Sequence, residues 1–389
     1  MKEVAIVSAV RSPVGKVGGM LAGVAPFDLT APVLNEAVRR AGIEAKELDE
    51  VLFSCLTVPQ IDSGRTYALY AGIPQEVPGM MMHRGCGSTI TSTAIAASMI
   101  KSGMGSTYLV GGMESNSNGA YLMEKPKKGF SMAPPKFLRS YITAPNYEYG
   151  DEPMGVTAEN VAEMYGITRE ECDAFALESQ RKAEAAWNEG FFDDQVLPYQ
   201  IKTGKETRTV QKDETVRTSS MEALGKLRPA FKENGVCTAG NSSPVCDGAS
   251  ALVVMDKEKA HSLGLPILAT IKDYVVIGRE PHTMGLGPVF ATKKIFQRNH
   301  FTFHDIDFIE LNEAFAAQVL GCYRLMEWPQ EKVNIHGGAI ALGHPTGATG
   351  AMLITKSVYE FRRSGAQRAL ITFCIGSGQG VAMILENNG

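Results

Sequence analysis

The sequence lacks the features that mark membrane-spanning and nucleic-acid-binding proteins. No apolar run reaches the roughly 18 residues that a transmembrane helix needs, and the first apolar stretch, Val4 to Val10, is short and lies between charged residues. Such a stretch is typical of a buried strand rather than a signal peptide. The formal net charge is −4 and there is no long run of Lys or Arg, so no broad positive field is available for nucleic acid. We therefore expect no membrane and no nucleic-acid partner.

The cysteines do not form the spaced pairs that disulfide frameworks and zinc sites need. There are 7 of them, an odd number, and none belongs to a CxxC pair, which argues against both. The GxSxG, HExxH, Walker A and EF-hand motifs are also missing, so the common hydrolase, metalloprotease and nucleotidase interpretations lack their residues. We expect no metal and no bound cofactor, and a cytoplasmic location fits the cysteines best.

What the sequence does contain is a globular composition with an excess of glycine. Of 389 residues, 44% are hydrophobic and 21% are charged, which is the balance of a protein that folds unaided. The 40 glycines exceed the average share of about 7% and predict many tight turns and close backbone contacts. The length suggests two or three domains.

Two parts of the chain repeat an alternation of short β-branched runs and longer amphipathic runs, which predicts an α/β fold. Residues 43–54 and 301–312 carry matching apolar and acidic positions, and the helix–Gly–strand units around Gly103 and Gly365 match at nearly the same separation. We infer two duplicated halves that each build a sheet. The alternative is that any two helix–Gly–strand units look alike.

A different region lies between the halves. Residues 113–155 are rich in Gly, Pro, Ser and Asn and are predicted to be a long loop, which in compact domains tends to be functional. A capping box at Thr168 predicts the start of a helix, which is expected to stop at Gly190. A second variable stretch then runs to about residue 248.

Cys86 is the best-placed nucleophile among the cysteines. It lies between a strand-like run and a small-residue helix whose N-cap is predicted to be Ser88 or Thr89. At a helix N-terminus, unpaired N–H groups and the macrodipole stabilise a thiolate, which lowers the pKa of the thiol. Glycines on both sides, Gly85 and Gly87, are expected to leave the sulfur room for a substrate. The alternative is that Cys86 is only a small buried hydrophobic residue.

A histidine in a glycine-rich turn is the candidate general base for that thiol. His344 lies in HGGAIALGHPTGATG, directly before a second small-residue helix, and could accept a proton from a thiol there. The alternatives are a loop histidine bonded to a carbonyl group, or His336 as the base. His336 is less favoured because it precedes the turn instead of standing at its tip.

Cys374 and Asn312 each follow a predicted strand, at the edge where open α/β sheets bind ligands. Cys374 opens CIGSGQG, a loop whose backbone N–H groups could stabilise an oxyanion. A dinucleotide site is excluded there, because the pattern is GxGxG and no helix follows to hold a pyrophosphate. Asn312 begins NEAFAAQ, and a helix N-cap role alone could explain it. Two thiols and an imidazole at such loops suggest one thiolate for acyl transfer and a second thiol that moves a proton on carbon.

An ordered series of motifs along nearly the whole chain resembles the thiolase family of acyl-CoA acyltransferases. Besides the region of Cys86, the series comprises SAVRSPVGK, GGMES, MGVTAENVAEMYGITRE, KLRPAF, TAGNSS, MGLGP, NEAFAAQ, HGGAIALGHPTGATG and CIGSGQG. The resemblance implies a five-layered αβαβα fold of two duplicated halves with an inserted loop domain. We place the N-terminal half at residues 1–118 and 249–268, the loop domain at 119–248 and the C-terminal half at 269–389.

The resemblance also implies roles for matching positions. Cys86 is expected to become acylated, His344 to activate it, and Cys374 to remove the α-proton of the incoming acetyl group. Asn312 and His344 are expected to hold one thioester oxygen, directly or through water, and the backbone N–H groups of Cys86 and Gly376 the other. The positions that match CoA and acyl-pocket contacts are Ser243, Met154 and Phe315.

The chain departs from the family near these motifs. The departures are His83 for Asn, Thr89 for Gly, Pro244 for Gly, Cys246 for Asn and Ser377 for Gly. Pro153 stands where acetyl-specific members generally have a histidine, so acetyl specificity does not follow from the resemblance.

The resemblance favours a two-step acyl transfer that interconverts 3-ketoacyl-CoA plus CoA with acyl-CoA plus acetyl-CoA. Two alternatives are a decarboxylating condensing enzyme of related fold, which would not need Cys374, and a catalytically silent acyl-CoA or lipid-binding protein. Acyl-CoA and CoA are the expected partners, in fatty acid metabolism, and we expect a homodimer or homotetramer. Candidate cations for the CoA phosphates are Lys125, Lys127, Lys128, Lys136, Arg139, Lys226 and Arg228.

Overall fold

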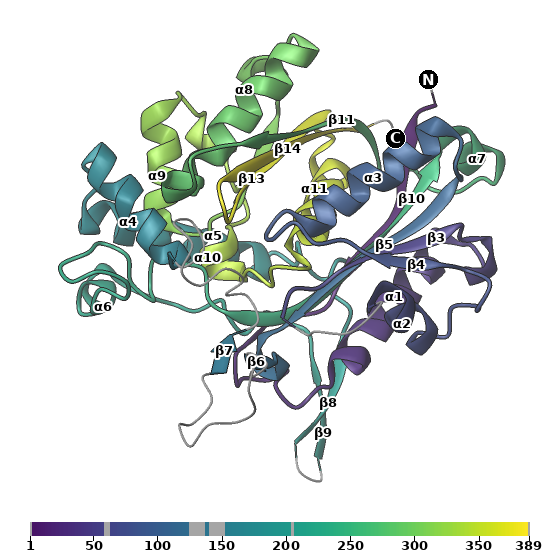
Figure 1. Ribbon diagram of the computed structural model, residues 1–389, viewed down its shortest axis with the longest axis horizontal. Coiled ribbons are helices and arrows are strands. Elements are labelled where there is room, and N and C mark those ends of the chain that lie inside the picture. Colours follow the sequence, from purple (N-terminus) through teal and green to yellow (C-terminus); the bar gives the residue numbers. More distant parts are fainter. Residues whose placement is uncertain (1, 58–62, 124–136, 140–151, 204–205, 388–389) are drawn as a thin grey trace, which may run out of the picture.

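The protein is built around one large sheet (Figure 1). The computed structural model describes residues 2–57, 63–123, 137–139, 152–203 and 206–387. The strands of the sheet are β1 (Val4–Arg11), β3 (Glu50–Ser54), β4 (Gly79–Met81), β5 (Thr107–Ser115), β10 (Cys246–Asp256), β11 (Ala269–Gly278), β12 (Phe308–Leu311), β13 (Arg368–Ile375) and β14 (Gln379–Glu386). They run in the order β12-β13-β14-β11-β1-β10-β5-β3-β4, and the short β2 (Gly15–Lys16) pairs with β10.

The two halves of this sheet have the same strand order and the same pairing directions. In the first half, β1 with β10 and β10 with β5 are antiparallel, and β5 with β3 is parallel. In the second half, β11 with β14 and β14 with β13 are antiparallel, and β13 with β12 is parallel. One further parallel partner follows at each outer edge, β4 beside β3 and Val333 beside Ile309 of β12. The duplication predicted from residues 43–54 and 301–312 is confirmed, because these segments contain β3 and β12.

Helices form three layers around the two half-sheets. The helices that pack on them are α1 (Pro26–Ala41), α2 (Ser63–Tyr70), α3 (Ser88–Ser102), α8 (Gly287–Asn299), α9 (Ala316–Leu325) and α11 (Thr349–Ser364). Buried side chains of α1 and α2 cluster with the first half-sheet, and those of α8 and α9 cluster with the second. Helices α3 and α11 share a cluster with strand residues of both halves, so they lie between the two. The expected αβαβα arrangement is confirmed.

Glycines end the two inner helices and turn the chain into the strands that follow. Gly103 after α3 has φ +80° and Gly365 after α11 has φ +72°, a left-handed conformation that glycine adopts without a Cβ clash. Strand β5 follows the first and β13 the second. The repeated helix–Gly–strand unit therefore occupies equivalent places in the two halves, and it carries both inner helices to the same layer.

The segment between the halves forms smaller elements outside the sheet. They are β6 (Tyr121–Met123), β7 (Phe137–Arg139), α4 (Met154–Tyr165), α5 (Arg169–Asn188), β8 (Tyr199–Thr203), β9 (Glu206–Val210) and α6 (Met221–Gly225); α7 (Lys257–Ser262) and α10 (Ala339–Leu342) complete the helices named here. The capping box at Thr168 is confirmed. The predicted domain boundaries stay a prediction.

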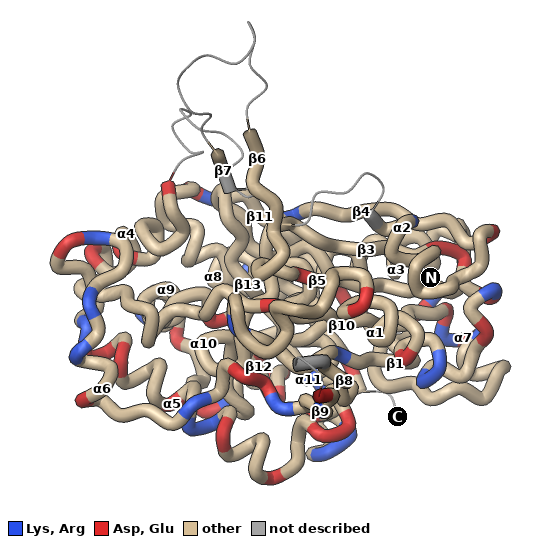
Figure 2. The backbone as a smooth tube through the Cα atoms, turned by 90° about the horizontal axis from the view of Figure 1, so that it is seen from below, with Lys and Arg blue, Asp and Glu red and all other residues tan. Residues whose placement is uncertain are grey.

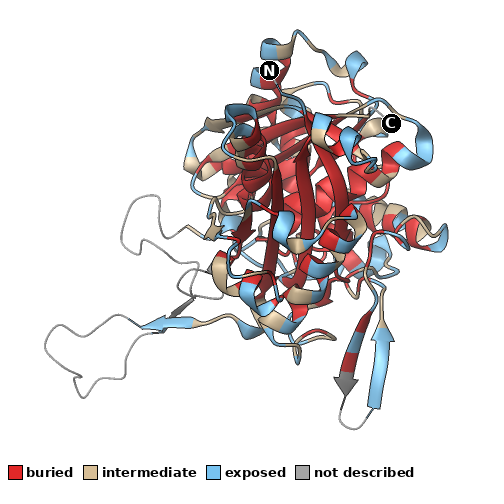
Figure 3. Cartoon of the chain, turned by 90° about the vertical axis from the view of Figure 1, so that its right-hand side faces the viewer, coloured by how far each residue is buried: buried red, intermediate tan, exposed pale blue. Residues whose placement is uncertain are grey.

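Burial divides the molecule into a closed core and projecting hairpins. Figure 3 shows the sheet and inner helices as buried, while the hairpins β6–β7 and β8–β9 extend away from them. Within the described ranges, no helix is long and apolar enough to cross a membrane.

Candidate active site

The turn before α3 is tightened by a serine instead of being capped by it. The N-cap of α3 is Gly87, without a capping side chain, so the prediction of Ser88 or Thr89 as the cap is wrong. The Ser88 hydroxyl donates to the carbonyl of Gly85 at 2.6 Å and accepts the N–H of Arg84 at 2.8 Å. Ser88 therefore closes the loop around the candidate nucleophile.

The loop of Cys86 packs directly on the end of β13. A Cβ added at Gly87 would lie 2.5 Å from Cδ1 of Ile375, a distance at which one of the two must move. Because β13 fills the space beside Gly87, the expectation that this glycine leaves room for a substrate is wrong. This close approach brings Cys86 to the strand end that carries the second candidate thiol.

Burial and two backbone N–H groups shift the pKa of the Cys86 thiol in opposite directions. The backbone N–H groups of Gly376 and of Cys86 itself favour the thiolate, but burial opposes them and raises the pKa of this thiol to about 11. Removal from water disfavours the thiolate, and here it outweighs the N–H groups. The lowered pKa expected at a helix N-terminus is not found, so the thiol needs a base to become a nucleophile at neutral pH.

Cys374 lies near Cys86 at the end of β13. It is buried in an apolar cluster that includes Phe315 and Met284. Burial raises the pKa of Cys374 well above its ordinary value, and interaction with Cys86 raises it further. The structure therefore brings together the two thiols that the sequence placed 288 positions apart.

The loop that carries His344 is held by groups from the other half of the molecule. The N–H of Gly347 donates to the Glu114 carboxylate on β5 at 2.9 Å. The N–H of Ala351 donates to the Thr89 hydroxyl on α3 at 3.1 Å. The first turns of α3 and α11 therefore meet, which places the histidine loop at the end of α3 where the nucleophile loop lies.

The ring of His344 is fixed at one nitrogen and open at the other. Nδ1 lies 2.7 Å from Oγ1 of Thr349, whose hydroxyl donates to the carbonyl of Pro345 at 2.9 Å. Because a hydroxyl has one hydrogen, Thr349 accepts from Nδ1–H, and the lone pair is on Nε2. Nε2 is buried without a hydrogen-bond partner among the described residues, and burial lowers the pKa of His344 to about 4. A neutral imidazole with a free acceptor is suited to take a proton from a thiol.

Asn312 is buried with both amide atoms unused. Its backbone N–H bonds the carbonyl of Thr372, two residues before Cys374 on β13. Its side-chain oxygen and nitrogen have no partner in the part of the chain that is described. Helix α9 begins at Ala316 after Phe315 as its N-cap, so the capping explanation of Asn312 is wrong. A buried amide without partners is costly, which indicates that these atoms serve a ligand or a water molecule.

His336, the alternative base, is tied to a different place. Its Nε2 lies 2.7 Å from the Glu360 carboxylate, and its ring stacks on Phe191 with centroids 3.6 Å apart. Burial lowers the pKa of His336 although Glu360 opposes this. Glu360 lies three turns along α11 from Thr349, so the ring nitrogen is engaged away from the cysteine loops.

Apolar side chains line the approach to Gly376. A Cβ added at Gly376 would lie 3.2 Å from Sδ of Met154, the first residue of α4. Phe315 meets Phe231 edge to face, with ring centroids 5.8 Å apart. The motif KLRPAF belongs to the family resemblance, but its last residue, Phe231, is not among the predicted site residues. The signal that could have found Phe231 is an aromatic residue within an otherwise variable stretch.

Ser243 belongs to a loop that is joined to the segment after Asn312. Its N–H donates to the carbonyl of Ala314 at 2.9 Å, so the expected CoA contact and acyl pocket come from adjacent chain segments.

Of the candidate cations, Lys226 pairs with Glu222 at 2.5 Å and Arg228 is exposed. Figure 2 shows basic and acidic segments interspersed along the described chain. Outside the described residues lie Lys125, Lys127, Lys128, Lys136 and the side chain of Arg139.

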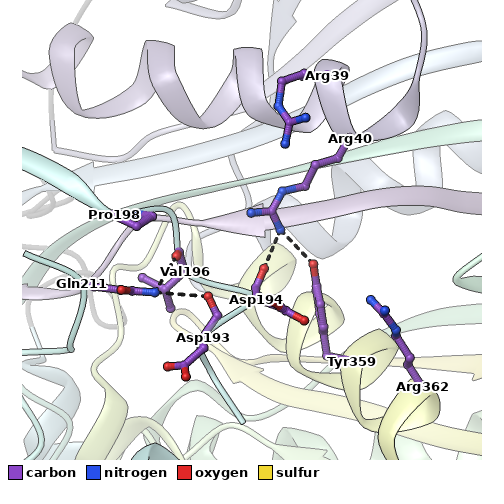
Figure 4. A pocket seen from close by; sticks show the side chains of 9 residues that line it. All are labelled: Arg39, Arg40, Asp193, Asp194, Val196, Pro198, Gln211, Tyr359 and Arg362. Carbon is purple, nitrogen blue, oxygen red and sulfur yellow. Dashed lines mark hydrogen bonds between the residues drawn. The ribbon is translucent and has the colours of Figure 1, made fainter. Parts of the chain in front are cut away.

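A cavity of about 430 Å³ lies at the opposite end of α11 from Thr349 (Figure 4). Its lining includes Arg40, whose guanidinium donates to the Asp194 carbonyl at 2.6 Å and to the Tyr359 hydroxyl at 2.8 Å. The lining arginines lie in the last turns of α1 (Arg39 and Arg40) and α11 (Arg362), where cations complement the helix dipole. This cavity holds no thiol or imidazole and takes no part in the candidate chemistry. Across the described ranges, no group of three or more His, Cys, Asp or Glu is arranged to hold a metal ion.

Comparison with known proteins gives matches along nearly the whole chain. One family model, described as "Thiolase, N-terminal domain", matches residues 4–258, and another, "Thiolase, C-terminal domain", matches residues 265–387. An acetyl-CoA acetyltransferase of Syntrophomonas wolfei is 41% identical over 394 residues, covering 99% of each protein. A beta-ketoadipyl-CoA thiolase of Escherichia coli is 41% identical over 399 residues, covering 99% of this chain and 100% of that protein. The solved structure of human mitochondrial 3-ketoacyl-CoA thiolase in complex with CoA has a TM-score of 0.93 at 35% identity, covering 100% of this chain and 98% of that one.

Proposed function

Because the chain belongs to the thiolase family, we propose that its acyl transfer runs through Cys86, His344 and Cys374. The protein is an acyl-CoA acyltransferase that interconverts 3-ketoacyl-CoA plus CoA with acyl-CoA plus acetyl-CoA. One arrangement carries the assignment of roles: the loop of Cys86 packs on Ile375 of β13, directly after Cys374, and the first turn of α3 meets the first turn of α11 behind the His344 loop. A thioester carbon bound to the Cys86 sulfur would have an oxyanion donor and a second acid/base within reach.

In the first step, His344 takes the proton of Cys86 at Nε2, and the sulfur attacks the thioester carbonyl. The negative charge that develops on oxygen is stabilised by the N–H groups of Cys86 and Gly376, each typically contributing about 10²–10³ in rate. The C–S bond to CoA then breaks. Cys374 gives its proton to the departing CoA sulfur, which leaves Cys86 acylated and Cys374 as a thiolate.

In the second step, the Cys374 thiolate removes the α-proton of acetyl-CoA. The enolate oxygen is held by Asn312 and His344, directly or through water, and this use explains why their buried polar atoms have no protein partner. The enolate carbon attacks the acyl group, and the bond to Cys86 breaks. The Cys86 sulfur recovers the proton from His344. Thiolysis follows the same steps in reverse.

The acyl group is proposed to be a hydrocarbon chain. Two relatives of equal identity are named for different acyl groups, acetyl and β-ketoadipyl, so identity does not select the substrate. Three apolar side chains lie near the thiols: Met154 against Gly376, Phe315 in the cluster of Cys374, and Phe231 against Gly155 and Phe315. Met154 and Phe231 are partly open to solvent, and the three side chains together offer a hydrocarbon chain apolar contacts while offering a carboxylate no paired charge.

The two alternatives are weaker. A decarboxylating condensing enzyme would not need the second thiol, and a silent carrier would not need the fixed tautomer of His344. The two relatives are named as an acetyltransferase and a thiolase, which also favours the transferase over both alternatives. The homodimer or homotetramer stays a prediction, as does the cytoplasmic location, which the free cysteines support.

Turnover of acetoacetyl-CoA with CoA, followed by a series of longer 3-ketoacyl-CoA substrates, tests the reaction and its range. Mass spectrometry of the acylated protein separates the two thiols. Cys86→Ala is expected to abolish the acyl-enzyme, whereas Cys374→Ala should still acylate but fail to condense. Cys172→Ala is the matched control, since Cys172 is a buried cysteine on α5 with no proposed role. Normal condensation by Cys374→Ala would overturn its role.

A further inference from the structure

The side chain of Cys246 points at the loop that carries the base. Its sulfur accepts the backbone N–H of His344 at 3.2 Å. Cys246 is fully buried in a small apolar cluster with Val14, Ala348 and Met352. The hydrogen bond recorded for the sulfur is the one from the His344 N–H, while the carboxylates of Asp247, Glu114 and Asp213 act on it only electrostatically.

Cys246 itself is rigidly placed. It is the first residue of β10 and pairs with Lys16 on β2. Its carbonyl accepts the Asn116 amide at 2.7 Å, and the N–H of Ser117 donates to the next residue, Asp247, at 2.9 Å. The sulfur is therefore a fixed point of the sheet against which a loop can be oriented.

The backbone at His344 needs such a fixed point. Gly343 has φ +90°, and a Cβ there would lie 2.7 Å from Cγ1 of Val14 and 3.2 Å from the Cys246 sulfur, so only glycine fits. Glycine leaves the peptide plane before His344 free to rotate, whereas Pro345 restricts the backbone of His344 itself. The bond to sulfur fixes that plane, and Thr349 fixes the ring.

We propose that Cys246 is a positioning residue for His344, holding the backbone of the base so that Nε2 faces the thiol of Cys86. The inference rests on the roles proposed above for these two residues. Cys246 is 0% exposed, so an acyl-CoA does not reach its sulfur, and burial also raises the pKa of this thiol far above its ordinary value. The sulfur acts by accepting a hydrogen bond and forms no covalent bond.

Replacing the sulfur with and without another acceptor tests the proposal. Cys246→Ala removes the acceptor, and Cys246→Ser keeps one. We expect Cys246→Ala to slow single-turnover acylation of Cys86 by about 10- to 100-fold, because a misplaced catalytic group costs this much, with KM changed by less than about twofold. Cys246→Ser should regain most of the rate, and Cys172→Ala should keep it.

A second readout does not depend on turnover. Alkylation of Cys86 by iodoacetamide at neutral pH reports how well His344 takes the proton, so Cys246→Ala should slow it and Cys246→Ser should restore it. Equal rates in Cys246→Ala and the wild type would overturn the proposal, as would a serine variant no faster than the alanine variant.

The experiment also distinguishes a variant that fails to fold from a failure of the proposed function itself. If Cys246→Ala does not fold, the acylation and alkylation rates of Cys246→Val and Cys246→Ser are compared instead, because valine fills the space but offers no acceptor. Equal rates in these two variants would also overturn the proposal. If the wild type itself forms no acyl-enzyme at Cys86, the proposed function fails, and the alkylation rates still report on the contact between Cys246 and His344.

Discussion

Thr349 determines which nitrogen of His344 can act as a base. The 2.7 Å contact between Nδ1 and Oγ1, together with the donation of the Thr349 hydroxyl to the Pro345 carbonyl, requires a hydrogen on Nδ1. The lone pair is then on Nε2, the atom that is buried without a partner among the described residues. The same helix that carries Thr349 thus selects the tautomer and directs the ring.

Thr349→Val should slow acylation of Cys86 without removing the base. Valine has the shape of threonine but no acceptor for Nδ1–H, so His344 loses its fixed tautomer. We expect roughly a 10- to 100-fold lower single-turnover rate, a part of the 10²–10⁴ that a general base typically supplies. Thr349→Ser keeps the hydroxyl and should retain most of the rate. Equal rates for valine and serine would contradict this role.

The pH dependence should show a base that stays neutral in mild acid. Burial lowers the pKa of His344 to about 4, below its ordinary value of about 6.5. Protonation removes the acceptor on Nε2, so activity is present above the folded pKa and lost as pH falls through it. The acid limb of kcat/KM, which reports the free enzyme, is expected near pH 4. A limb near pH 6.5, measured with a protein still folded by circular dichroism, would mean that Nε2 is solvated.

Most of the fold follows from local patterns that survive in the sequence. The segments 43–54 and 301–312 lead into equivalent strands, and Gly103 and Gly365 end equivalent helices. Such features depend on neighbouring residues, which is why the pattern predicts them. Ser377, which stands where the family usually has glycine, has a φ of +63°, in the left-handed region that favours glycine.

Contacts between segments that are distant in the sequence could not be predicted from sequence patterns. Thr89 is one of the two N-caps that the sequence predicts for α3, but its hydroxyl accepts the N–H of Ala351 in the other half. The direction of the pKa shift of Cys86 was wrong because burial, a property of the folded chain, outweighs the helix terminus. Cys246 was visible only as a departure from the family, since its contact with His344 spans 98 positions.

Asn312→Ala should separate activity from stability. Its amide atoms have no partner in the described chain, so removing them breaks no hydrogen bond of the fold. We expect an activity loss of about 10²–10³ and a free energy of unfolding within about 1 kcal/mol of the wild type. Denaturant unfolding and steady-state turnover measure the two quantities.

Asn334→Ala is the matched control for Asn312. Asn334 is equally buried, but its amide donates to the carbonyl of Leu311 at 2.7 Å and to Glu313 at 2.8 Å, and accepts the Leu311 N–H at 2.9 Å. Its loss should lower the free energy of unfolding by about 1–3 kcal/mol. Similar destabilisation by both alanine variants would show that Asn312 is structural.

Phe231→Ala should shift the enzyme toward longer acyl chains. Phe231 stands edge-on to Phe315, and its ring fills the space beside Gly155, where an added Cβ would lie 2.2 Å from Cγ of Phe231. Removing the ring opens the wall of the acyl side, and each additional methylene that is then buried contributes about 1–3 kcal/mol. The ratio of kcat/KM for a six-carbon over a four-carbon 3-ketoacyl-CoA should rise at least about tenfold. Phe301→Ala, which removes a ring under Arg368, is the control; an unchanged ratio in Phe231→Ala would place the acyl chain elsewhere.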